Sequence, residues 1–290
     1  MSISNIILNQ NNLSLTSNVL DITTQAAPYN KLQLNLGSAN LQGKKIALNK
    51  ISMYYSWPNI TNSNNTFQVS WPTGTNTYTN FSIVIPAFTN YSTVADLNTY
   101  LQTVLIANGL YLINSTTSNN LYYIQFVSNP NLYGVSLVLN VVPTSLTAGY
   151  TQPANFTGYP SVARTMKLTT DTSDFNLIIG YGKSSVFDGN TATITYNSLY
   201  VPQFSPVSSI NVTCNLANNA MALNNDSTII YTATTAGVNY GSIIKIEPTN
   251  LVYYDIATTA NTHVIAFTDQ NGVPLYVKDP AINIFLLISS

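Results

Sequence analysis

The chain has 290 residues, of which only 7% are charged, and its 9 basic and 10 acidic side chains nearly cancel. An ordinary soluble domain carries about 25% charged residues, so Asn, Thr, Ser and Tyr fill the polar positions here. No cluster of basic residues exceeds the pair Lys44-Lys45. The lack of a basic cluster argues against a nucleic-acid-binding function. The small fraction of charged residues suits a protein that is packed against neighbouring copies.

The rest of the composition excludes further classes of protein. Cys214 is the only Cys, so no disulfide framework is expected. The first ten residues have no basic region before a long apolar run, and we therefore expect no signal peptide. No apolar stretch approaches 18 residues in length, so we expect no membrane span. Sequons such as Asn59-Ile60-Thr61 arise by chance in an Asn- and Thr-rich chain, and without a secretory signal we expect them to be unmodified.

The first part of the chain predicts an arm followed by strands. Residues 1–27 are polar without a sustained period, and we interpret them as an extended N-terminal arm. Residues 31–36 alternate between Leu and polar residues, which predicts a half-buried strand. The alternation of residues 45–57 changes face in mid-run. A pattern of period two cannot do so without an extra residue, so we expect a β-bulge near Asn49-Lys50.

The middle of the chain contains one clear helix. Short strands are expected at residues 66–71 and 81–85, and the helix covers residues 92–109. Thr93 with Asp96 resembles a capping box, and Asn108-Gly109 is a typical C-terminal stop. Its expected apolar face comprises Val94, Leu97, Leu101, Val104 and Leu105.

The following residues alternate between strands and loops. Strands are expected at residues 121–127 and 135–142, a long loop at 144–163, and a helical turn at 173–179 that Gly180 ends. From Ser208 onward only strands are expected, at residues 210–216, 228–232, 242–246, 251–256 and 263–267.

The C-terminal stretch predicts a hairpin and a buried strand. Asp269 to Gly272 lies between two apolar runs, and Asn271-Gly272 is typical of a two-residue type I′ turn with positive φ at both residues. Residues 282–288 are almost continuously apolar, which predicts a strand covered on both faces of a sheet. The C-terminus is therefore expected to be part of the core.

Strands without intervening helices indicate an all-β fold, either a sandwich or a barrel of antiparallel strands. The simplest architecture places residues 28–73 and 207–290 in one β-sandwich domain. The segment 74–206, which contains the helix, is then a small α/β domain inserted into it.

Two short motifs resemble ligand-binding loops but fail on spacing. Gly182-Lys183-Ser184 resembles the end of a phosphate-binding loop, yet Leu177 occupies the position where that loop needs Gly. Asp269 with Asn271 and Gly272 resembles part of a calcium loop, but no Glu follows at the required distance. A turn explains both motifs better.

No residue set predicts catalysis or metal binding. His263 is the only His and opens an expected strand, so a structural role is favoured over acid–base work. Cys214 alternates with apolar residues and is interpreted as a core residue. Asp171 and Asp174 are explained as well by charge at a helix N-terminus as by acid catalysis. We therefore assign no catalytic, cofactor-binding or metal-binding residue. Tyr and Asn side chains in residues 144–163 could contact sugars, a receptor or another subunit.

Several segments of the chain resemble the minor capsid, or penton, proteins of virophages and of Polinton-like viruses. The resemblance rests on VSSINVTCNLANN (207–219), STIIYTATT (227–235), YGSIIKIEP (240–248) and IAFTDQNGVPLYVKDPAINIFLLI (265–288), which resemble the closing half of those proteins. FSIVIPAFTNYSTVADLNTYLQ (81–102) resembles their middle region. The resemblance is loose before residue 45, and no Arg-Gly-Asp loop of the adenovirus penton type is present.

The resemblance implies a single jelly roll in the capsid shell, with the inserted domain facing outward. Five copies would form a homopentamer at each vertex of an icosahedral capsid, flanked by trimers of a double-jelly-roll major capsid protein. The protein would then be part of the virion, assembled inside the infected host cell, with no enzymatic activity, no cofactor and no specific nucleic acid.

Two other classes of function compete with this one. A viral fibre or lectin-like β module that binds a host receptor or glycan is the main alternative. A glycoside-processing enzyme on a jelly roll is the weakest hypothesis, because it needs two carboxylates flanking a cleft and this chain has only ten acidic residues spread along it.

Overall fold

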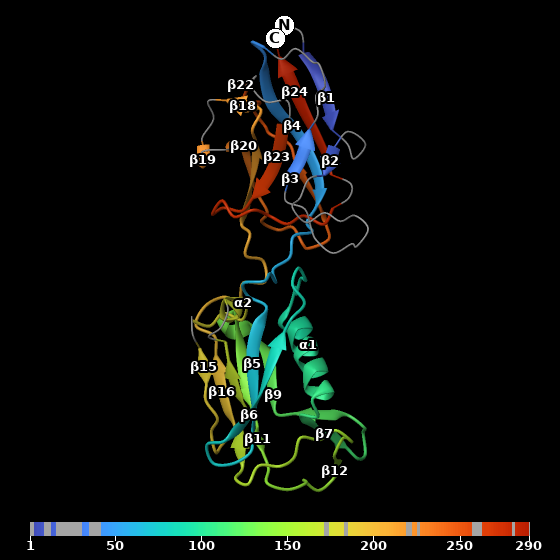
Figure 1. The fold of residues 1–290 in the computed structure, drawn as a ribbon, viewed down its shortest axis with the longest axis vertical. Coiled ribbons are helices and arrows are strands. Elements are labelled where there is room, and N and C mark those ends of the chain that lie inside the picture. Colours follow the sequence, from blue (N-terminus) through green and yellow to red (C-terminus); the bar gives the residue numbers. More distant parts are fainter. Residues whose placement is uncertain are drawn as a thin grey trace. The chain divides into compact units, whose positions relative to one another are not determined.

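A computed structural model describes residues 3–8, 13–15, 31–34, 42–170, 174–182, 185–218, 222–224, 227–256, 263–279 and 282–289. The chain divides into two compact units. Unit 1 comprises Met1–Pro58 with Pro206–Ser290, and unit 2 comprises Asn59–Ser205. Both units consist mainly of antiparallel strands (Figure 1).

The described residues of unit 1 form two antiparallel sheets. The first has the order β1 (Ile3–Leu8), β24 (Asn283–Ser289), β4 (Lys45–Tyr54), β22 (Tyr254–Ile256) and β18 (Ala217–Asn218), and β21 (Ile243–Ile246) also pairs with β4. The second has the order β19 (Ala222–Asn224), β20 (Ser227–Thr234), β17 (Ser209–Cys214), β23 (His263–Thr268), β3 (Lys31–Leu34) and β2 (Leu13–Leu15). Each sheet therefore combines strands from both ends of the sequence, as the colours of Figure 1 show.

One hydrophobic core lies between these sheets. Ile51 and Leu286 come from the first sheet, Val212 and Phe267 come from the second, and all four are buried in the same cluster. Because both sheets bury one face in a common core, unit 1 is a two-layer β structure.

The expected β-bulge in β4 is confirmed. Phe285 of β24 pairs with Lys50, whereas the next residue, Leu286, pairs with Leu48, so Asn49 is the extra residue. Leu48 and Ile51 are buried on either side of it while Asn49 is exposed. The bulge thus lets one strand keep both of its apolar sets inside the core.

The C-terminal strand is also confirmed. β24 pairs with β1 along one edge and with β4 along the other, which gives it two neighbouring strands. Ile284 and Leu286 are buried in the core, and Leu287, which points to the opposite face, is also buried. Both faces are therefore covered near the end of this strand, as the apolar run predicts.

The turn that follows β23 differs from the prediction. Gly272 donates a hydrogen bond to the carbonyl of Asp269 (3.0 Å), and Asp269 donates one to the carbonyl of Val273 (2.9 Å). Within this turn only Gly272 has a positive φ, 79°. The two-residue type I′ turn is therefore wrong: the loop has three residues and ends on a left-handed Gly. The chain then leaves the second sheet and joins the first through β24.

The N-terminal segment also differs in part from the expected arm. Residues 3–8 form β1 beside β24, and residues 13–15 form β2 beside β3. Residues 16–27 lie outside the described residues. Because an edge strand needs only backbone pairing on one side, a polar segment without a clear period can still belong to a sheet.

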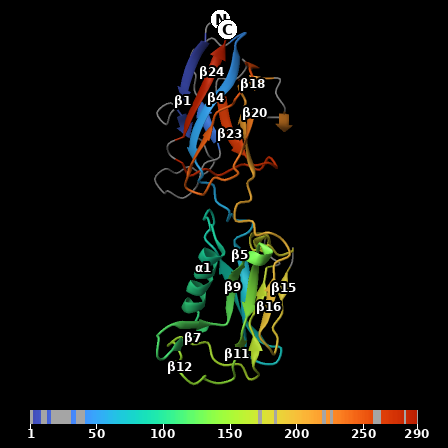
Figure 2. The same ribbon diagram turned by 180° about the vertical axis from the view of Figure 1, so that it is seen from behind.

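The described residues of unit 2 form four small antiparallel sheets, one long helix and two short ones. The sheets have the orders β16 (Ile194–Asn197), β10 (Gly134–Leu139), β9 (Ile124–Asn129); β11 (Val141–Val142), β13 (Arg164–Thr165); β12 (Tyr150–Thr151), β7 (Tyr111–Asn114), β8 (Asn120–Tyr122); and β15 (Val186–Phe187), β14 (Lys167–Thr169), β5 (Thr66–Pro72), β6 (Tyr78–Val84). The helix α1 (Val94–Ala107) lies beside β9 in both views (Figures 1 and 2). The shorter helices are η1 (Pro130–Leu132) and α2 (Phe175–Ile178).

Helix α1 has the predicted termini and apolar face. The Thr93 hydroxyl accepts from the Asp96 backbone (3.1 Å), and the Asp96 carboxylate accepts from the Thr93 backbone (3.0 Å), which completes the capping box. Leu97, Leu101 and Leu105 are buried in a second hydrophobic cluster with Phe67 and Leu137, and Val104 is partly buried against it. Unit 2 thus has a core of its own.

The boundary between the units differs from the predicted one. The sequence predicts that residues 66–71 belong to the sandwich, but β5 pairs with β6 and β14 inside unit 2. Unit 2 accordingly begins at Asn59 rather than near residue 74. A short amphipathic strand contains no information about which sheet it joins, so local pattern could not locate this boundary.

Candidate contact surfaces and the predicted site residues

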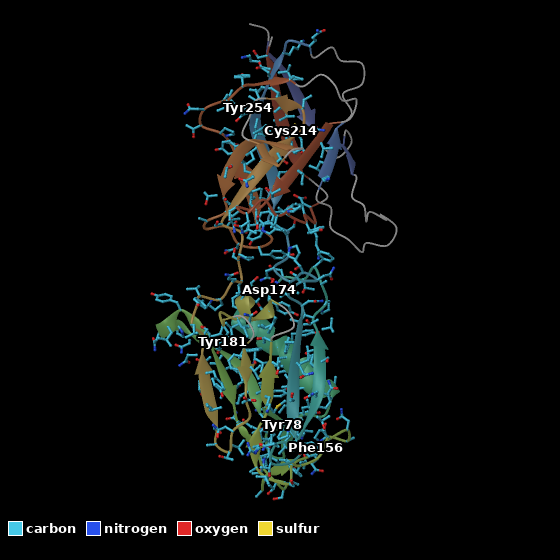
Figure 3. All side chains as sticks on the ribbon, turned by 60° about the vertical axis from the view of Figure 1, so that its left-hand side comes forward. Tyr78, Phe156, Asp174, Tyr181, Cys214 and Tyr254 are labelled. Carbon is cyan, nitrogen blue, oxygen red and sulfur yellow. The ribbon has the colours of Figure 1, made fainter. Side chains whose placement is uncertain are left out.

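Two of the residues considered for catalysis lie in strands of unit 1. His263 opens strand β23, and Cys214 lies at the end of β17, buried in the core of unit 1 (Figure 3). Burial raises the pKa of the Cys214 thiol to about 11. Hydrogen bonds with the backbone of Leu216 and Ala217 lower the pKa, but by less than burial raises it. A thiol in this state is a poor nucleophile.

Of the two acidic residues considered for catalysis, the structure describes only Asp174. Asp174 precedes the four-residue helix α2 and donates its backbone N–H to the carbonyl of Ser63 (3.1 Å). Asp171, Lys183 and Ser184 lie outside the described residues. Across the described parts of the chain, no group of three or more His, Cys, Asp or Glu side chains could hold a metal ion.

Asp269, considered above as part of a calcium loop, serves the hairpin turn. Its Oδ1 atom accepts hydrogen bonds from the backbone N–H groups of Asn271 and Val273, each at 2.8 Å. The carboxylate therefore stabilises the three-residue loop that Gly272 ends.

The long loop at residues 144–163 caps the end of helix α1. Asn155 donates its amide to the carbonyls of Ile106 (3.3 Å) and Ala107 (3.2 Å), and the hydroxyl of Thr157 donates to the carbonyl of Asn108 (2.8 Å). The last carbonyls of a helix lack partners within it, so the loop satisfies them. Asn155, one of the residues considered for sugar or receptor contact, is thus engaged inside unit 2.

The aromatic residues of the same loop pack inward. Phe156 lies 6.0 Å from the Trp71 ring and 4.8 Å from the Tyr159 ring, measured between centroids. The indole N–H of Trp71 donates to the carbonyl of Gly158 (2.8 Å). Tyr78 and Phe156 lie toward the same end of unit 2 (Figure 3). These contacts hold the loop on the core and favour a structural role for its aromatic side chains.

Tyr181 is a buried polar residue that the sequence analysis missed. Its hydroxyl accepts from the backbone N–H of Leu137 (3.1 Å) and lies 2.7 Å from the carbonyl oxygen of Tyr196. Burial raises its pKa to about 12. The residue links the region after α2 to β10 and β16, a long-range role that leaves no local signal in the sequence.

Both lysines of β4 form ion pairs with acidic residues of unit 1. Lys45 pairs with Asp255 of β22 (3.6 Å), and Lys50 pairs with Glu247, which follows β21. The hydrogen bond from Lys50, together with its charge, lowers the pKa of the exposed Glu247 carboxyl. Pairs this exposed are screened by salt and contribute little to stability.

Much of unit 2, in contrast, carries no charge. Residues 97–163 and 189–205 of unit 2 contain no Asp, Glu, Lys, Arg or His, and the second run continues without charge to residue 225 in unit 1. The sheet β16-β10-β9 lies entirely within these runs. Val127, Ser136 and Asn197 lie side by side on one of its faces, where Val127 and Asn197 are exposed and Ser136 is buried between them. Ser136 donates to the amide oxygen of Asn197 (2.7 Å) and accepts from Asn129 (3.0 Å). This neutral sheet face presents amide, hydroxyl and apolar groups only.

An exposed apolar patch adjoins the neutral sheet face. It comprises Leu132, Tyr133, Leu199, Tyr200 and Val201, which are 58% to 79% exposed. The two halves of the patch are held together because Ser198 donates its backbone N–H to the carbonyl of Val135 (2.8 Å), and its hydroxyl accepts from Val135 N–H (2.9 Å). Clustered exposed apolar side chains of this kind are typical of interaction surfaces.

The fold and surface define a class of protein: a mostly antiparallel β chain with few helices, two separate cores and a largely neutral second unit. No helix among the described residues is long and apolar enough to cross a membrane. No family model matches this chain, and no curated protein matches it.

Among solved structures, the chain is similar to the crystal structure of the penton protein of mavirus. The similarity covers 99% of this chain and 98% of that chain, with a TM-score of 0.44 and 13% sequence identity.

Proposed function

We propose that this chain is a structural penton protein, the minor capsid protein at the five-fold vertices of an icosahedral virus. One observation supports it most directly. The segments that resemble virophage and Polinton-like penton proteins form strands at the centre of unit 1: residues 207–219 contain β17, and residues 265–288 contain most of β23 and β24. The resemblance therefore falls on the strands that build one core rather than on scattered surface segments.

In this proposal unit 1 is a single jelly roll in the capsid shell, and unit 2 is the inserted domain on the outside of the particle. Both termini contribute strands to unit 1, and the chain leaves it after Pro58 and returns at Pro206, which supports an insertion. The chain acts as a homopentamer in the virion, flanked by trimers of a double-jelly-roll major capsid protein, and is assembled inside the infected host cell. It has no enzymatic activity and no cofactor.

The distribution of charge supports close packing of copies. A five-fold ring is closed by heterologous contacts, in which two different flanks of each copy meet. Surfaces without charge can approach one another without desolvating ions or juxtaposing like charges. The neutral runs at residues 97–163 and 189–225 offer such surfaces.

The proposal is tested by co-expression with the major capsid protein of the same virus. Light scattering after size exclusion measures the mass of the purified chain, and electron microscopy of the particles shows whether the five-fold vertices are occupied. We expect a pentamer, either alone or on assembly, and filled vertices. A chain that stays monomeric or trimeric and never enters particles would contradict the proposal.

A fibre or lectin-like module remains the second candidate, and one observation favours it. Tyr133 and Tyr200 are exposed beside the amide and hydroxyl groups of the neutral sheet face, and sugars are commonly bound by aromatic and amide side chains. On a glycan array this candidate predicts binding that the double substitution Tyr133→Ser, Tyr200→Ser abolishes. A chain that binds no glycan contradicts the candidate.

A further inference from the structure

The chain crosses between the two units at two places, and each crossing is anchored within unit 2. The incoming segment, residues 59–64, is held by Ile60, whose backbone N–H donates to the carbonyl of Thr89 (3.1 Å). The outgoing segment, residues 200–204, is held by Gln203, whose N–H donates to the carbonyl of Leu177 (3.2 Å). Thr89 and Leu177 belong to different parts of unit 2. Ser63 of the incoming segment also accepts from the backbone N–H of Asp174 (3.1 Å), which precedes the helix α2 that contains Leu177, so these anchors connect the two segments only indirectly, through α2.

Asn59 connects them directly. Its side chain is buried, with 4% of the residue exposed. Its amide nitrogen donates to the carbonyl oxygens of Tyr91 (2.7 Å) and Phe204 (2.9 Å), and its amide oxygen accepts from the backbone N–H of Tyr91 (3.0 Å). Both donor hydrogens of the amide are therefore used, one toward the loop that anchors the incoming segment and one toward the outgoing segment.

We propose that Asn59 is a clamp that holds the incoming and outgoing segments of unit 2 together. Without it, hydrogen bonds connect the incoming and outgoing segments only through helix α2, so the two segments can open independently. With it, neither segment can move away without breaking a buried hydrogen bond to the other, so unit 2 opens as one body. The inference concerns unit 2 alone and does not depend on the proposed function.

The two Trp residues of the chain make the test specific to each unit. Trp57 is buried in the core of unit 1, and Trp71 is buried in the core of unit 2. In the full chain, Trp57→Phe leaves an indole that reports only on unit 2, and Trp71→Phe leaves one that reports only on unit 1. In these two backgrounds, Asn59→Ala is expected to lower the Trp71 melting transition by roughly 5–15 °C and to leave the Trp57 transition in place.

Hydrogen exchange distinguishes a clamp from an ordinary buried amide. Asn59→Asp keeps the acceptor for the Tyr91 N–H but loses both donors and places carboxylate oxygens against two carbonyls. We expect faster exchange at Gln203 in the outgoing segment, while the Tyr91 amide keeps more of its protection. Asn65→Ala is the matched control, because Asn65 is also buried and donates its amide to the carbonyl of Ile85 (3.0 Å) without touching the outgoing segment.

A clamp and a merely local role of Asn59 predict different patterns of hydrogen exchange. The clamp predicts that Asn59→Ala accelerates exchange in both the incoming and outgoing segments, whereas Asn65→Ala leaves the outgoing segment protected. Faster exchange near Tyr91 alone, with Gln203 unchanged, would show that Asn59 only stabilises a local turn and would overturn the proposal. If Asn59→Ala does not fold, the unmodified chain decides: a clamp predicts that Ile60, Tyr91 and Gln203 exchange through one opening with equal free energy, and unequal values refute it.

Discussion

At the residue scale, a few side chains decide whether a turn or a core position is tolerated. Gly272 ends the loop after β23 with φ at 79°, a conformation that β-branched residues strongly disfavour. Asp269 stabilises the same loop by accepting two backbone hydrogen bonds. Cys214 is fully enclosed, and its thiol serves the core as a small apolar group.

Gly272→Val is therefore expected to destabilise unit 1 by about 1–3 kcal/mol, because Val must adopt a positive φ. Thermal unfolding followed by Trp57 emission in the Trp71→Phe background measures the loss. Gly272→Asn is the control, since Asn tolerates the left-handed region, and it should cost clearly less. If the Val variant melts with the parent, the loop does not depend on Gly272.

The raised pKa of Cys214 predicts a pH dependence of stability. The thiol ionises in the unfolded chain near its usual pKa of about 8.5, but in the folded chain only near 11. This contribution to stability is complete below the lower value and is lost as the pH rises through the window between the two. We expect the free energy of unfolding to fall more steeply over this window in the parent than in Cys214→Ala. Denaturant unfolding at several pH values measures this fall for both proteins. If the free energy of unfolding changes equally with pH in the two, the thiol contributes nothing to the pH dependence.

At the element scale, helix α1 combines local and long-range stabilisation. Its capping box is a local feature, and the face bearing Leu97 and Leu101 packs into the core of unit 2. At the other end, Gly109 has φ at 65° and lies so close to the carbonyl of Asn155 that an added Cβ would meet it at 2.0 Å. The long loop and the helix therefore form one packed element.

Thr93→Ala removes the N-cap acceptor and is expected to destabilise unit 2 by about 0.5–2 kcal/mol. Thr99→Ala is the matched control, because Thr99 is exposed in mid-helix and donates its hydroxyl only to the carbonyl of Ala95. This control should be neutral or slightly stabilising, since Ala has the higher helix propensity. Trp71 emission in the Trp57→Phe background reports both, and equal effects of the two substitutions would argue against the capping role.

Strand β1 adds a prediction about truncation. It pairs with β24 along its length, from Ile3 opposite Ser289 to Leu8 opposite Ile284. Deleting residues 1–10 exposes that edge of β24, so we expect a lower melting temperature for unit 1 and more aggregation through the free edge. Circular dichroism and light scattering measure these effects. A truncated chain as stable and as soluble as the parent would show that residues 1–10 contribute nothing to the sheet and act only as an arm.

At the scale of the whole molecule, the distribution of surface charge limits the kinds of contact that the proposed assembly has available. The ion pairs described for unit 1 are few and exposed, while the neutral sheet face of unit 2 has none to offer. Association between such surfaces depends on apolar and hydrogen-bonding contact rather than on attraction between ions.

Self-association is therefore expected to change little between low and high salt, because few ion pairs are available to screen. Sedimentation at about 0.05 and 0.5 M salt, on either side of the ionic strength at which the Debye length is near 10 Å, measures this. A complex that dissociates at high salt would contradict the expectation.

The double substitution Leu199→Lys, Tyr200→Lys in the exposed apolar patch should raise solubility without lowering either melting transition, because neither side chain is buried.

The sequence by itself determined the features that depend on neighbouring residues. The capping box and apolar face of α1 follow from side-chain spacing within one helix. The bulge at Asn49 follows from a change of phase within one strand, and the C-terminal strand follows from an unbroken apolar run. In each case the physical cause lies within a few residues of the observed effect.

Only the tertiary structure decided which strands pair and where each unit begins. β5 joined unit 2 because its partners, β6 and β14, lie there, and the latter is formed by residues for which the sequence analysis predicted no strand. The three-residue turn at Gly272 depends on how β23 meets the chain after it, and the Asn59 clamp joins positions 145 residues apart. Pairing of this kind is fixed by burial and hydrogen bonding between distant segments, which local periodicity does not encode.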